Sequence, residues 1–468
     1  MGRLIGVSNR TAADPNARAG GLAVALWDAL VASNGTWFGW SGRTVDEARG
    51  IEMFSDGGVD FALVDLTHEE HERFYLGYSN RALWPIFHYR TDLANFDDED
   101  FAGYEAVNHR FARLLSKQLK PDDVVWVHDY HFCLMGEELR QHGFDGRIGY
   151  FLHIPFPAPE VFRTLPEHTR LARAMTAYNL LGFQTEDHKA NFERYLLEFA
   201  GGRKNDDGTV SVHGRTVTLK AYPIGIDVDD FAALAEKDKA REASTRIGRF
   251  LGGRELVLGV DRMDYSKGLP QRFEAVGRLI RDYPDLHGKV SYTQIAPPSR
   301  TKVDEYAELR EQLDQLSGSI NGDHGDLDWI PIRYLARSYT RDELAGLYRI
   351  ARVGLVTPLR DGMNLVAKEF IAAQDPHDPG VLVLSHFAGA ASQMPEALLV
   401  NPYDTHEVAD AIYRAIHMPL EERKERWSAI DKTIREKDIY WWRQTFLHDL
   451  GHIDAESDLP PVELNGAA

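Results

Sequence analysis

Short apolar runs recur along the chain, and polar or basic residues follow them directly. Each run has the length of a buried strand, and between runs apolar residues recur at helical spacing, as in Leu22, Leu26 and Leu30. The predicted strands are Leu4–Val7, Val124–Val127, Ile148–Leu152 and Leu180–Phe183 in the first half, and Leu256–Val260, Lys289–Ile295, Val353–Val356 and Val381–Leu384 in the second. Strands that alternate with helices in both halves predict an α/β fold with two doubly wound, Rossmann-like domains.

The two halves meet at Tyr222–Asp227, which we interpret as a linker because a highly charged helical stretch follows it. We expect one domain over residues 1–222 and a second over 223–438. Residues 439–468 should form a helix that packs back on the first domain, followed by a loose tail. Ligands of such sheets bind outside the carboxyl ends of the strands, so two domains facing each other across a cleft would hold a substrate there.

Four local patterns predict smaller features. The Gly- and Trp-rich segment Trp37–Gly42 indicates a turn, and Asp97–Asp100 indicates the first turn of a helix. Val210–Val212 and Val217–Leu219 flank a His-Gly pair and suggest a hairpin. Thr340 and Glu343 have the spacing of a capping box.

Composition and charge narrow the class of protein. The chain has 468 residues, of which 43% are hydrophobic and 27% charged, and its formal net charge is -19. That charge disfavours binding to nucleic acid or anionic membranes. Cys133 is the single cysteine, no run is apolar enough to span a membrane, and the first residues do not resemble a signal peptide. We therefore expect a cytoplasmic protein with no nucleic-acid or membrane partner.

The segment from Pro358 to Glu369 joins a predicted strand to a helix over Asn364–Ala373 through a polar loop. The first N–H groups of such a helix lack partners in the helix, and its dipole is positive there, so the loop suits an anion such as phosphate. Glu369 lies further along, where a carboxylate can accept hydrogen bonds from sugar hydroxyls. A packed strand–helix junction with an exposed charged loop fits the spacing equally well.

Four basic residues lie just after predicted strands. Arg262 and Lys267 share a loop that ends in Gly268, where two cations could neutralise a diphosphate leaving group without a metal. Arg10 and Arg300 are isolated in sequence, and an arginine fork suits a phosphate monoester. Surface charges in a solvated loop, or arginines paired with nearby carboxylates, are the alternatives for these four.

Rings and possible metal ligands are less specific. Trp40, Tyr75 and Trp84 could line a sugar or belong to the core. His153 could bond a reacting hydroxyl or satisfy buried backbone. His128 and His131 flank Asp129 but have no further ligand cluster near them in sequence. Three Asp-x-Asp patterns are short enough to arise by chance among 72 acidic residues, namely Asp98–Asp100, Asp227–Asp229 and Asp326–Asp328. We predict no metal site.

Several long motifs together resemble the trehalose-6-phosphate synthase family, and the resemblance runs from about residue 3 to about residue 450. The motifs are Ser8–Arg10, Ala19–Leu22, Leu83–Pro85, Val127–His131, Phe151–Pro157, Asp261–Gly268, Gln294–Arg300 and Thr357–Glu369. The resemblance implies a retaining glycosyltransferase of the two-Rossmann-domain (GT-B) type. It would transfer glucose from UDP-glucose to glucose 6-phosphate, giving α,α-trehalose 6-phosphate and UDP, with no metal or other cofactor.

The resemblance also assigns roles. The second domain would bind the nucleotide sugar, and the first domain the acceptor. The implied donor-binding residues are Gly20, Gly21, Arg262, Lys267, Tyr339, Asp361, Gly362, Met363, Asn364, Leu365, Val366, Ala367, Lys368 and Glu369. The implied acceptor-binding residues are Arg10, Trp40, Tyr75, Trp84, Asp129 and Arg300. Trp84 and Ile154 would select the α-anomer, and His153, Asp361, Arg262 and Lys267 would carry the catalysis.

Family precedent implies that the acceptor attacks from the face that UDP leaves, while a leaving phosphate oxygen takes its proton. A relative that uses GDP-glucose, ADP-glucose or a nucleotide-cyclitol remains an alternative. So does an idle sensor, although the residues such a protein would lack, including Lys267, Asp361 and Glu369, are present. We expect a homo-oligomer.

Overall fold

The computed structural model describes residues 2–13, 21–298 and 304–452. The chain divides into two compact units, which are described separately. Unit 1 comprises Met1–Ile224 and Ile439–Ala468, and unit 2 comprises Gly225–Asp438. The first division therefore falls two residues after the predicted boundary, and the second coincides with it.

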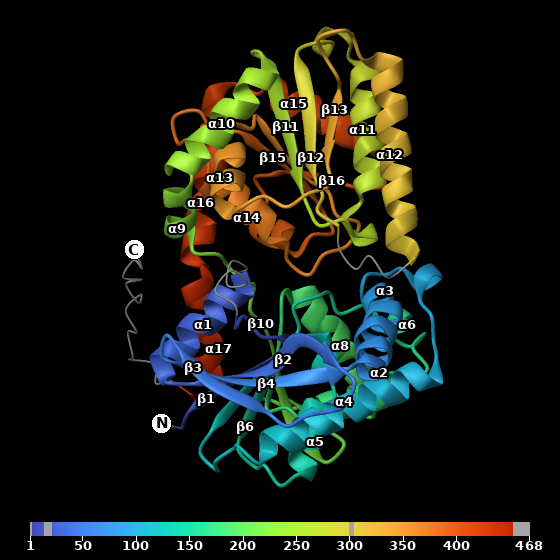
Figure 1. Ribbon diagram of the computed structural model, residues 1–468, viewed down its shortest axis with the longest axis vertical. Helices are drawn as coiled ribbons and strands as arrows, with labels where there is room; N and C mark the ends of the chain where they lie inside the picture. Colours follow the sequence, from blue (N-terminus) through green and yellow to red (C-terminus); the bar gives the residue numbers. More distant parts are fainter. Residues whose placement is uncertain (1, 14–20, 299–303, 453–468) are drawn as a thin grey trace. The chain divides into compact units, whose positions relative to one another are not determined.

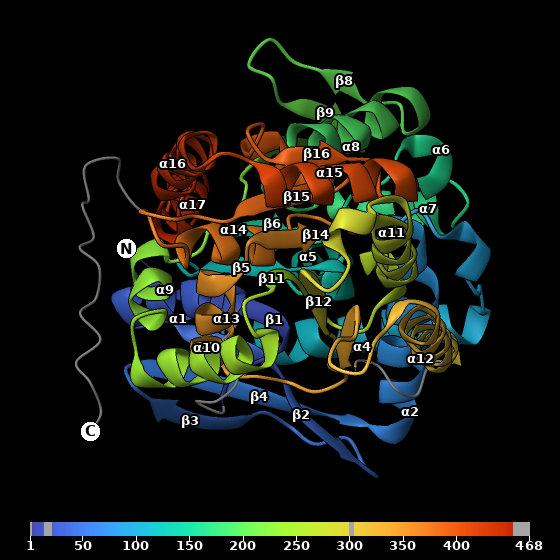
Figure 2. The same ribbon diagram turned by 90° about the horizontal axis from the view of Figure 1, so that it is seen from above.

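Unit 1 is built on a sheet with the strand order β3-β4-β2-β1-β5-β6-β7-β10-β9-β8. Its strands are β1 (Leu4–Arg10), β2 (Thr36–Val45), β3 (Glu52–Asp56), β4 (Val59–Thr67), β5 (Val124–His128), β6 (Arg147–Phe151), β7 (Leu180–Phe183), β8 (Arg203–Lys204), β9 (Val210–Val212) and β10 (Arg215–Ala221). In this spatial order, neighbouring strands from β4 to β10 pair in parallel. Antiparallel pairs lie at the two edges, formed by β3 with β4 at one edge and by β8, β9 and β10 at the other (Figure 2). The predicted hairpin is the antiparallel pair β9–β10.

The segment predicted as a turn at Trp37–Gly42 is instead part of β2, and that prediction was wrong. The strand pairs in parallel with both β1 and β4, and its own Trp37 and Phe38 rings are buried. Gly39 is needed for packing rather than for a turn, because a Cβ there would lie 2.1 Å from the Ser8 carbonyl oxygen. Glycine in a strand often marks such a close backbone approach.

Helices and helical turns connect the strands of unit 1. They are α1 (Gly21–Ser33), α2 (His68–Glu70), η2 (His71–Leu83), α3 (Trp84–Phe87), η3 (Thr91–Leu93), α4 (Asp98–Ser116), η4 (Tyr130–Phe132), α5 (Met135–Gln141), α6 (Pro159–Phe162), α7 (His168–Met175), α8 (Glu186–Phe199) and α17 (Ile439–Asp449). Asp97 caps α4 by accepting from the N–H groups of Glu99 and Asp100, which confirms the predicted helix start. The element η2 is a π-helix, a form that is rare and frequently found at functional sites.

Helix α17 returns the end of the chain to unit 1. The rings of Trp442 and Phe446 are buried and pack on Trp126 of β5, with ring centroids 5.0 and 4.8 Å apart. Burying side chains of this size stabilises a fold by about 1.5–3 kcal/mol each. The aromatic contacts therefore fix α17 on the face of the unit 1 sheet.

Unit 2 contains an all-parallel sheet with the strand order β13-β12-β11-β14-β15-β16. Its strands are β11 (Glu255–Val260), β12 (Val290–Ile295), β13 (Ile332–Leu335), β14 (Val353–Val356), β15 (Val381–Ser385) and β16 (Leu398–Val400). Its helical elements are α9 (Val228–Leu234), α10 (Asp238–Leu251), η5 (Tyr265–Lys267), α11 (Leu269–Asp282), η6 (Pro284–Leu286), α12 (Asp304–His324), α13 (Arg341–Ile350), α14 (Leu365–Ala372), η7 (Gly389–Gln393), α15 (Thr405–His417) and α16 (Leu420–Glu436). Helix α11 packs on α12 and α15, while α13 packs on α10, α9 and α14, so helices cover both faces of the sheet (Figure 1).

The apolar runs predicted as strands all form strands, and the predicted α/β fold with two doubly wound units is confirmed. The Thr340–Glu343 capping box is present at the start of α13. No helix among the described residues is both long enough and apolar enough to span a membrane.

Candidate functional site

In unit 2, the two predicted phosphate-binding segments follow the neighbouring parallel strands β11 and β14. The Lys267 ammonium forms an ion pair with the Asp361 carboxylate, although the two residues are 94 positions apart in sequence. Asn364 Nδ2 also donates to Asp361 Oδ2, at 3.1 Å. The structure therefore brings three of the sequence-predicted donor residues into direct contact.

A buried ion pair beneath these loops holds them in place. Arg272 is fully buried and donates to Asp261 Oδ2 at 2.7 Å. It also donates to Thr357 Oγ1 at 3.0 Å and to the Lys267 carbonyl at 3.3 Å, so one guanidinium joins both loops. Breaking a buried pair from one side costs about 3–5 kcal/mol. Sequence reasoning missed Arg272, because an arginine inside a helix gives no signal of its own.

The loop before α14 is pinned by backbone contacts. Asp361 N–H donates to the Phe387 carbonyl at 3.1 Å, and Gly389 N–H donates to the Asp361 carbonyl at 3.2 Å. A Cβ on Gly389 would lie 1.9 Å from the Gly362 carbonyl oxygen, so this approach requires glycine. These contacts aim the Asp361 side chain toward Lys267 and Asn364.

Helix α14 begins at Leu365, one residue after the predicted start, and Asn364 is its N-cap. Asn364 has a left-handed backbone (φ 74°), and its side-chain oxygen accepts from Ala367 N–H at 3.4 Å. Leu365 and Val366 are the first helical residues, so their N–H groups lie at the positive end of the helix dipole. Met363 is buried, and its carbonyl accepts from Ala390 N–H.

The later residues of α14 have different surroundings. Lys368 is fully buried and donates to Gln393 Oε1 at 2.7 Å, and burial lowers the pKa of its ammonium to about 7. Glu369 is half-buried, and burial raises the pKa of its carboxyl. After β13, Arg337 stacks on the Tyr339 ring at 4.7 Å and donates to its hydroxyl at 2.8 Å. Arg262 is exposed on the loop after β11.

In unit 1, the predicted acceptor residues form a group of rings. Trp40 on β2 and Tyr75 on η2 have centroids 5.7 Å apart. The His131 ring stacks on the Tyr75 ring, with centroids 5.9 Å apart and an interplanar angle of 14°. Trp84 is buried and packs on Tyr130 at 5.6 Å. The sequence suggests His131 only as a possible metal ligand and does not predict its place in this aromatic group.

His153 lies just after β6 and contacts residues that follow β5. Its backbone N–H donates to Asp129 Oδ1 at 3.2 Å, and its Nε2 is 3.1 Å from His128 Nδ1. Burial lowers the pKa of His153 to about 3 and also lowers that of His128 well below its ordinary value. Asp129 has a positive φ of 73°, which turns its carboxylate toward the His153 backbone. Both imidazoles are therefore neutral at neutral pH.

The remaining predicted residues are placed as follows. Arg10 ends β1, is exposed, and lies against Gly42, where a Cβ would be 3.0 Å from Arg10 Nε. Ile154 is buried, and Gly21 is the first residue of α1. Gly20 and Arg300 lie outside the described residues.

His128 and His131, which the sequence offers as possible zinc ligands, do not form a metal site among the described residues. His128 bonds to His153, whereas His131 stacks on Tyr75. The described members of the short acidic patterns also do not gather into a group of three ligands.

Known proteins match this chain along nearly its whole length. The model of glycosyltransferase family 20 matches residues 6–452. The chain is 47% identical over 455 residues to the trehalose-6-phosphate synthase of Enterobacter sp. strain 638, covering 96% of this chain and 95% of that one. It is 42% identical to the trehalose-6-phosphate synthase of Sodalis glossinidius, with all of both chains covered.

Solved structures are similar to the same extent. A UDP-forming α,α-trehalose-phosphate synthase from Burkholderia xenovorans, in complex with glucose-6-phosphate, is 46% identical with a TM-score of 0.93, covering 96% of this chain and 100% of that one. An E. coli structure bound with UDP-2-fluoro glucose is 44% identical with a TM-score of 0.93, covering 96% and 99%. Because the family model matches residues 6–452 and the solved structures agree along nearly the full chain, the chain belongs to glycosyltransferase family 20.

Proposed function

We propose that the chain transfers glucose from UDP-glucose to glucose 6-phosphate with retention, giving α,α-trehalose 6-phosphate and UDP. The observation that carries this proposal is the family match over residues 6–452, combined with the contact of Lys267, Asp361 and Asn364 at the strand ends of unit 2. Similar solved structures bound glucose-6-phosphate or a fluorinated UDP-glucose. The reaction belongs to trehalose biosynthesis in the cytoplasm.

The donor is bound mainly by unit 2. Lys267 and Arg262 neutralise the diphosphate, and the N–H groups of Leu365 and Val366 add the positive end of a helix dipole. Asp361 accepts hydrogen bonds from hydroxyls of the transferred glucose. The remaining donor contacts are backbone groups of Gly20, Gly21 and residues 362–368, the Glu369 carboxylate on the ribose and Tyr339 near the base.

The Lys267–Asp361 ion pair gives the donor site its order before the donor arrives. Both side chains are nearly buried, with 11% and 14% of their surfaces exposed. A diphosphate that binds near Lys267 competes with Asp361 for the ammonium group. Because Asp361 then interacts less with Lys267, its carboxylate lone pairs become available to the sugar. This exchange couples binding of the phosphates to orientation of the glucose.

The acceptor is bound mainly by the aromatic group of unit 1. Trp40 and Tyr75 line the sugar, Asp129 accepts from its hydroxyls, and Trp84 and Ile154 select its α-anomer. Arg10 and Arg300 bind the 6-phosphate, because a guanidinium fork matches phosphate oxygens.

The transfer step needs no protein nucleophile in this proposal. The acceptor's anomeric oxygen bonds to C1 of the donor glucose on the face from which the UDP oxygen departs. That C1–oxygen bond breaks, its electrons pass to UDP, and a phosphate oxygen takes the acceptor's proton. The protein positions the reactants and stabilises charge on the diphosphate. A neutral His153, with its pKa near 3, can hydrogen-bond a reacting hydroxyl but cannot supply a cation at neutral pH.

Two further properties belong to the proposal. Transfer is metal-independent, since Arg262, Lys267 and a helix terminus already supply positive charge to the diphosphate. The chain acts as a homo-oligomer, which the molecular mass in solution would test.

The deciding experiment is a panel of UDP-, GDP- and ADP-glucose against glucose 6-phosphate, with the product identified by NMR. We expect trehalose 6-phosphate with both anomeric centres in the α configuration, formed fastest from UDP-glucose. Faster transfer from GDP- or ADP-glucose would correct the donor. No trehalose 6-phosphate from any glucosyl donor would refute the proposal in favour of a nucleotide-cyclitol donor or a non-catalytic role.

A further inference from the structure

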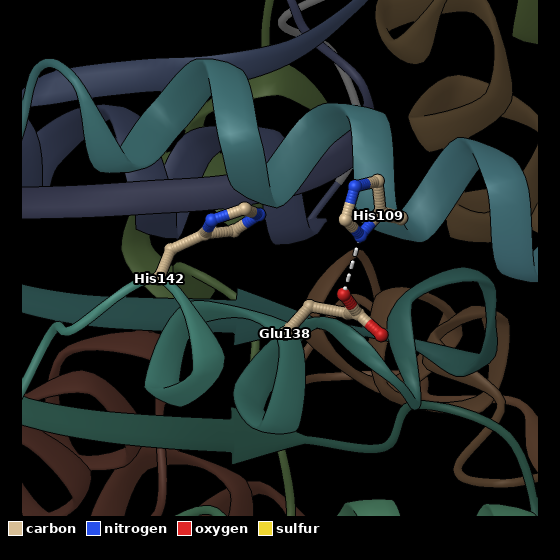
Figure 3. A group of neighbouring side chains, drawn as sticks. All are labelled: His109, Glu138 and His142. Atoms are coloured by element: carbon tan, nitrogen blue, oxygen red, sulfur yellow. Dashed lines mark hydrogen bonds and ion pairs between the residues drawn. The ribbon is translucent and has the colours of Figure 1, made fainter.

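Three potential metal ligands meet on unit 1 between helices α4 and α5. His109 lies on α4, Glu138 lies on α5, and His142 follows one turn later at the end of α5 (Figure 3). One ligand atom from each of the three lies within 4.8 Å of the others. His109 Nδ1 and Glu138 Oε2 are already 2.8 Å apart. This is the one such group among the residues that the structure describes.

The other contacts of Glu138 leave its Oε2 atom available to the two histidines. Arg170 lies 3.8 Å from the other carboxylate oxygen, Oε1. Arg170 is itself bonded to Glu105 at 2.9 Å and to Glu137 at 2.5 Å, so its charge is largely satisfied by those two. The Glu138 carboxylate is nearly buried and therefore held in one orientation.

His142 supplies an independent indication. Its Nε2 is buried and has no hydrogen-bond partner among the described residues. Its ring centroid is 5.2 Å from that of His109. A buried ring nitrogen without a partner loses its hydrogen bonds to water, which destabilises the folded protein. A metal ion bound to that nitrogen would compensate the loss.

We propose that His109, Glu138 and His142 bind a divalent zinc ion. Two imidazoles and one carboxylate form a ligand set that zinc uses with a water in the fourth position. Ligand atoms of a tetrahedral zinc lie about 3.3 Å apart, given Zn–N and Zn–O distances of about 2.0–2.1 Å. The present separations bracket this value, and the His109 side chain is 54% exposed. Magnesium, which prefers oxygen ligands, fits the set poorly.

Zinc at this position would clamp α4 to α5. Helix α4 supports the ring group of the acceptor site through its neighbouring turns, because Tyr104 Oη donates to the Tyr130 carbonyl at 2.7 Å and Asn108 Nδ2 donates to the His131 carbonyl at 3.1 Å. The three ligands themselves are not among the residues proposed to touch a substrate. The metal site is therefore structural and separate from the transfer reaction.

The test is zinc binding to the full-length protein after metal removal with a chelator. Calorimetry should show one zinc bound per chain, a raised thermal unfolding midpoint with zinc, and no rise with magnesium. His109→Gln and His142→Gln should each weaken zinc binding at least about tenfold, since loss of even an outer partner of a ligand costs roughly 10–100-fold. Cobalt should give the strong visible absorption of a tetrahedral site in the wild type but not in His109→Gln or His142→Gln.

The matched control is His406→Gln. His406 also pairs with a carboxylate, Asp410, at 3.2 Å, but no third ligand joins them among the described residues. This variant should bind zinc like the wild type, and all three variants should keep wild-type glucosyl transfer. Equal zinc binding by the wild type, His109→Gln and His142→Gln would place the ion elsewhere and overturn the proposal, as would failure of the wild type to bind zinc.

Discussion

The two proposed substrate sites use opposite physical means. The donor site of unit 2 is organised by charge, with the Lys267–Asp361 ion pair above the buried Asp261–Arg272 pair. The acceptor site of unit 1 is organised by rings, and burial holds His153 and His128 of the same unit neutral.

This difference follows the chemistry of the two substrates. A diphosphate that gains charge as it leaves is stabilised best by cations in a partly buried setting, where Coulomb interactions are stronger than in water. A sugar ring held for attack needs apolar walls and neutral hydrogen-bonding groups. Changes in unit 2 should therefore act on the chemical step, and changes in unit 1 on acceptor binding.

The largest effect is expected for Lys267→Ala. Without this ammonium, charge on the leaving diphosphate loses a stabilising partner, and we expect kcat to fall by about 10²–10³. Arg262→Ala should act in the same direction. Steady-state kinetics with both substrates measures the loss.

The matched control for this loss is Lys424→Ala, which removes a lysine from α16 of the same unit. Lys424 pairs at 3.7 Å with Glu421 on that helix, so its loss should leave kcat unchanged. Thermal unfolding of the Lys267 variant checks that Asp361 without its partner does not unfold unit 2. Wild-type turnover in a folded Lys267→Ala protein would remove this residue from the donor site.

A smaller effect is expected for Tyr75→Leu in unit 1. The substitution removes the ring between Trp40 and His131 but keeps apolar volume. Ring contacts of this kind contribute about 0.5–1.5 kcal/mol, so the KM for glucose 6-phosphate should rise about threefold to tenfold with kcat little changed. Tyr403→Leu is the control, because Tyr403 is 58% exposed in unit 2. A fall in kcat with an unchanged acceptor KM would contradict the division between the two units.

Sequence patterns predicted the sheets and the strand ends that carry the sites, because period, length and flanking polar residues are local signals. Helix α14 was predicted for the same reason, although the role of Asn364 as its cap was not. The pairing of Lys267 with Asp361 could not be read from a pattern, since it depends on two loops 94 residues apart meeting at neighbouring strands.

Three features that the sequence did not predict have a common cause. The Trp37–Gly42 segment looked like a turn because glycine is frequent in turns, but here glycine admits a neighbouring backbone. The π-helix η2 and the ring contacts of His131 also depend on tertiary packing. Spacing alone left His131 as a possible metal ligand, and only the fold separates it from the His109, Glu138 and His142 group.

The acid sensitivity of unit 1 should depend on His153. Its pKa is about 3 in the folded protein and 6.5 as the ordinary value, so between these pH values the unfolded chain binds a proton that the folded chain excludes. The stability contributed by the neutral ring is present above pH 6.5 and is lost as the pH falls toward 3, by at most about 1.4 kcal/mol per pH unit. His153→Gln should show a shallower decline of the thermal midpoint in this window. Parallel curves for the two proteins would contradict the burial of a neutral imidazole.

The smallest effect is expected from a chelator, and it tests whether the charge of unit 2 is sufficient by itself. If Arg262, Lys267 and the start of α14 stabilise the leaving diphosphate, excess EDTA should leave the transfer rate unchanged. The proposed zinc site adds a discriminating control, because EDTA would also remove zinc from His109, Glu138 and His142 and lower the thermal midpoint of the wild type. In His142→Gln, EDTA should neither remove zinc from this site nor lower the thermal midpoint. A loss of transfer that magnesium restores in both proteins would mean that the donor site needs a metal after all, since the variant cannot owe that loss to zinc.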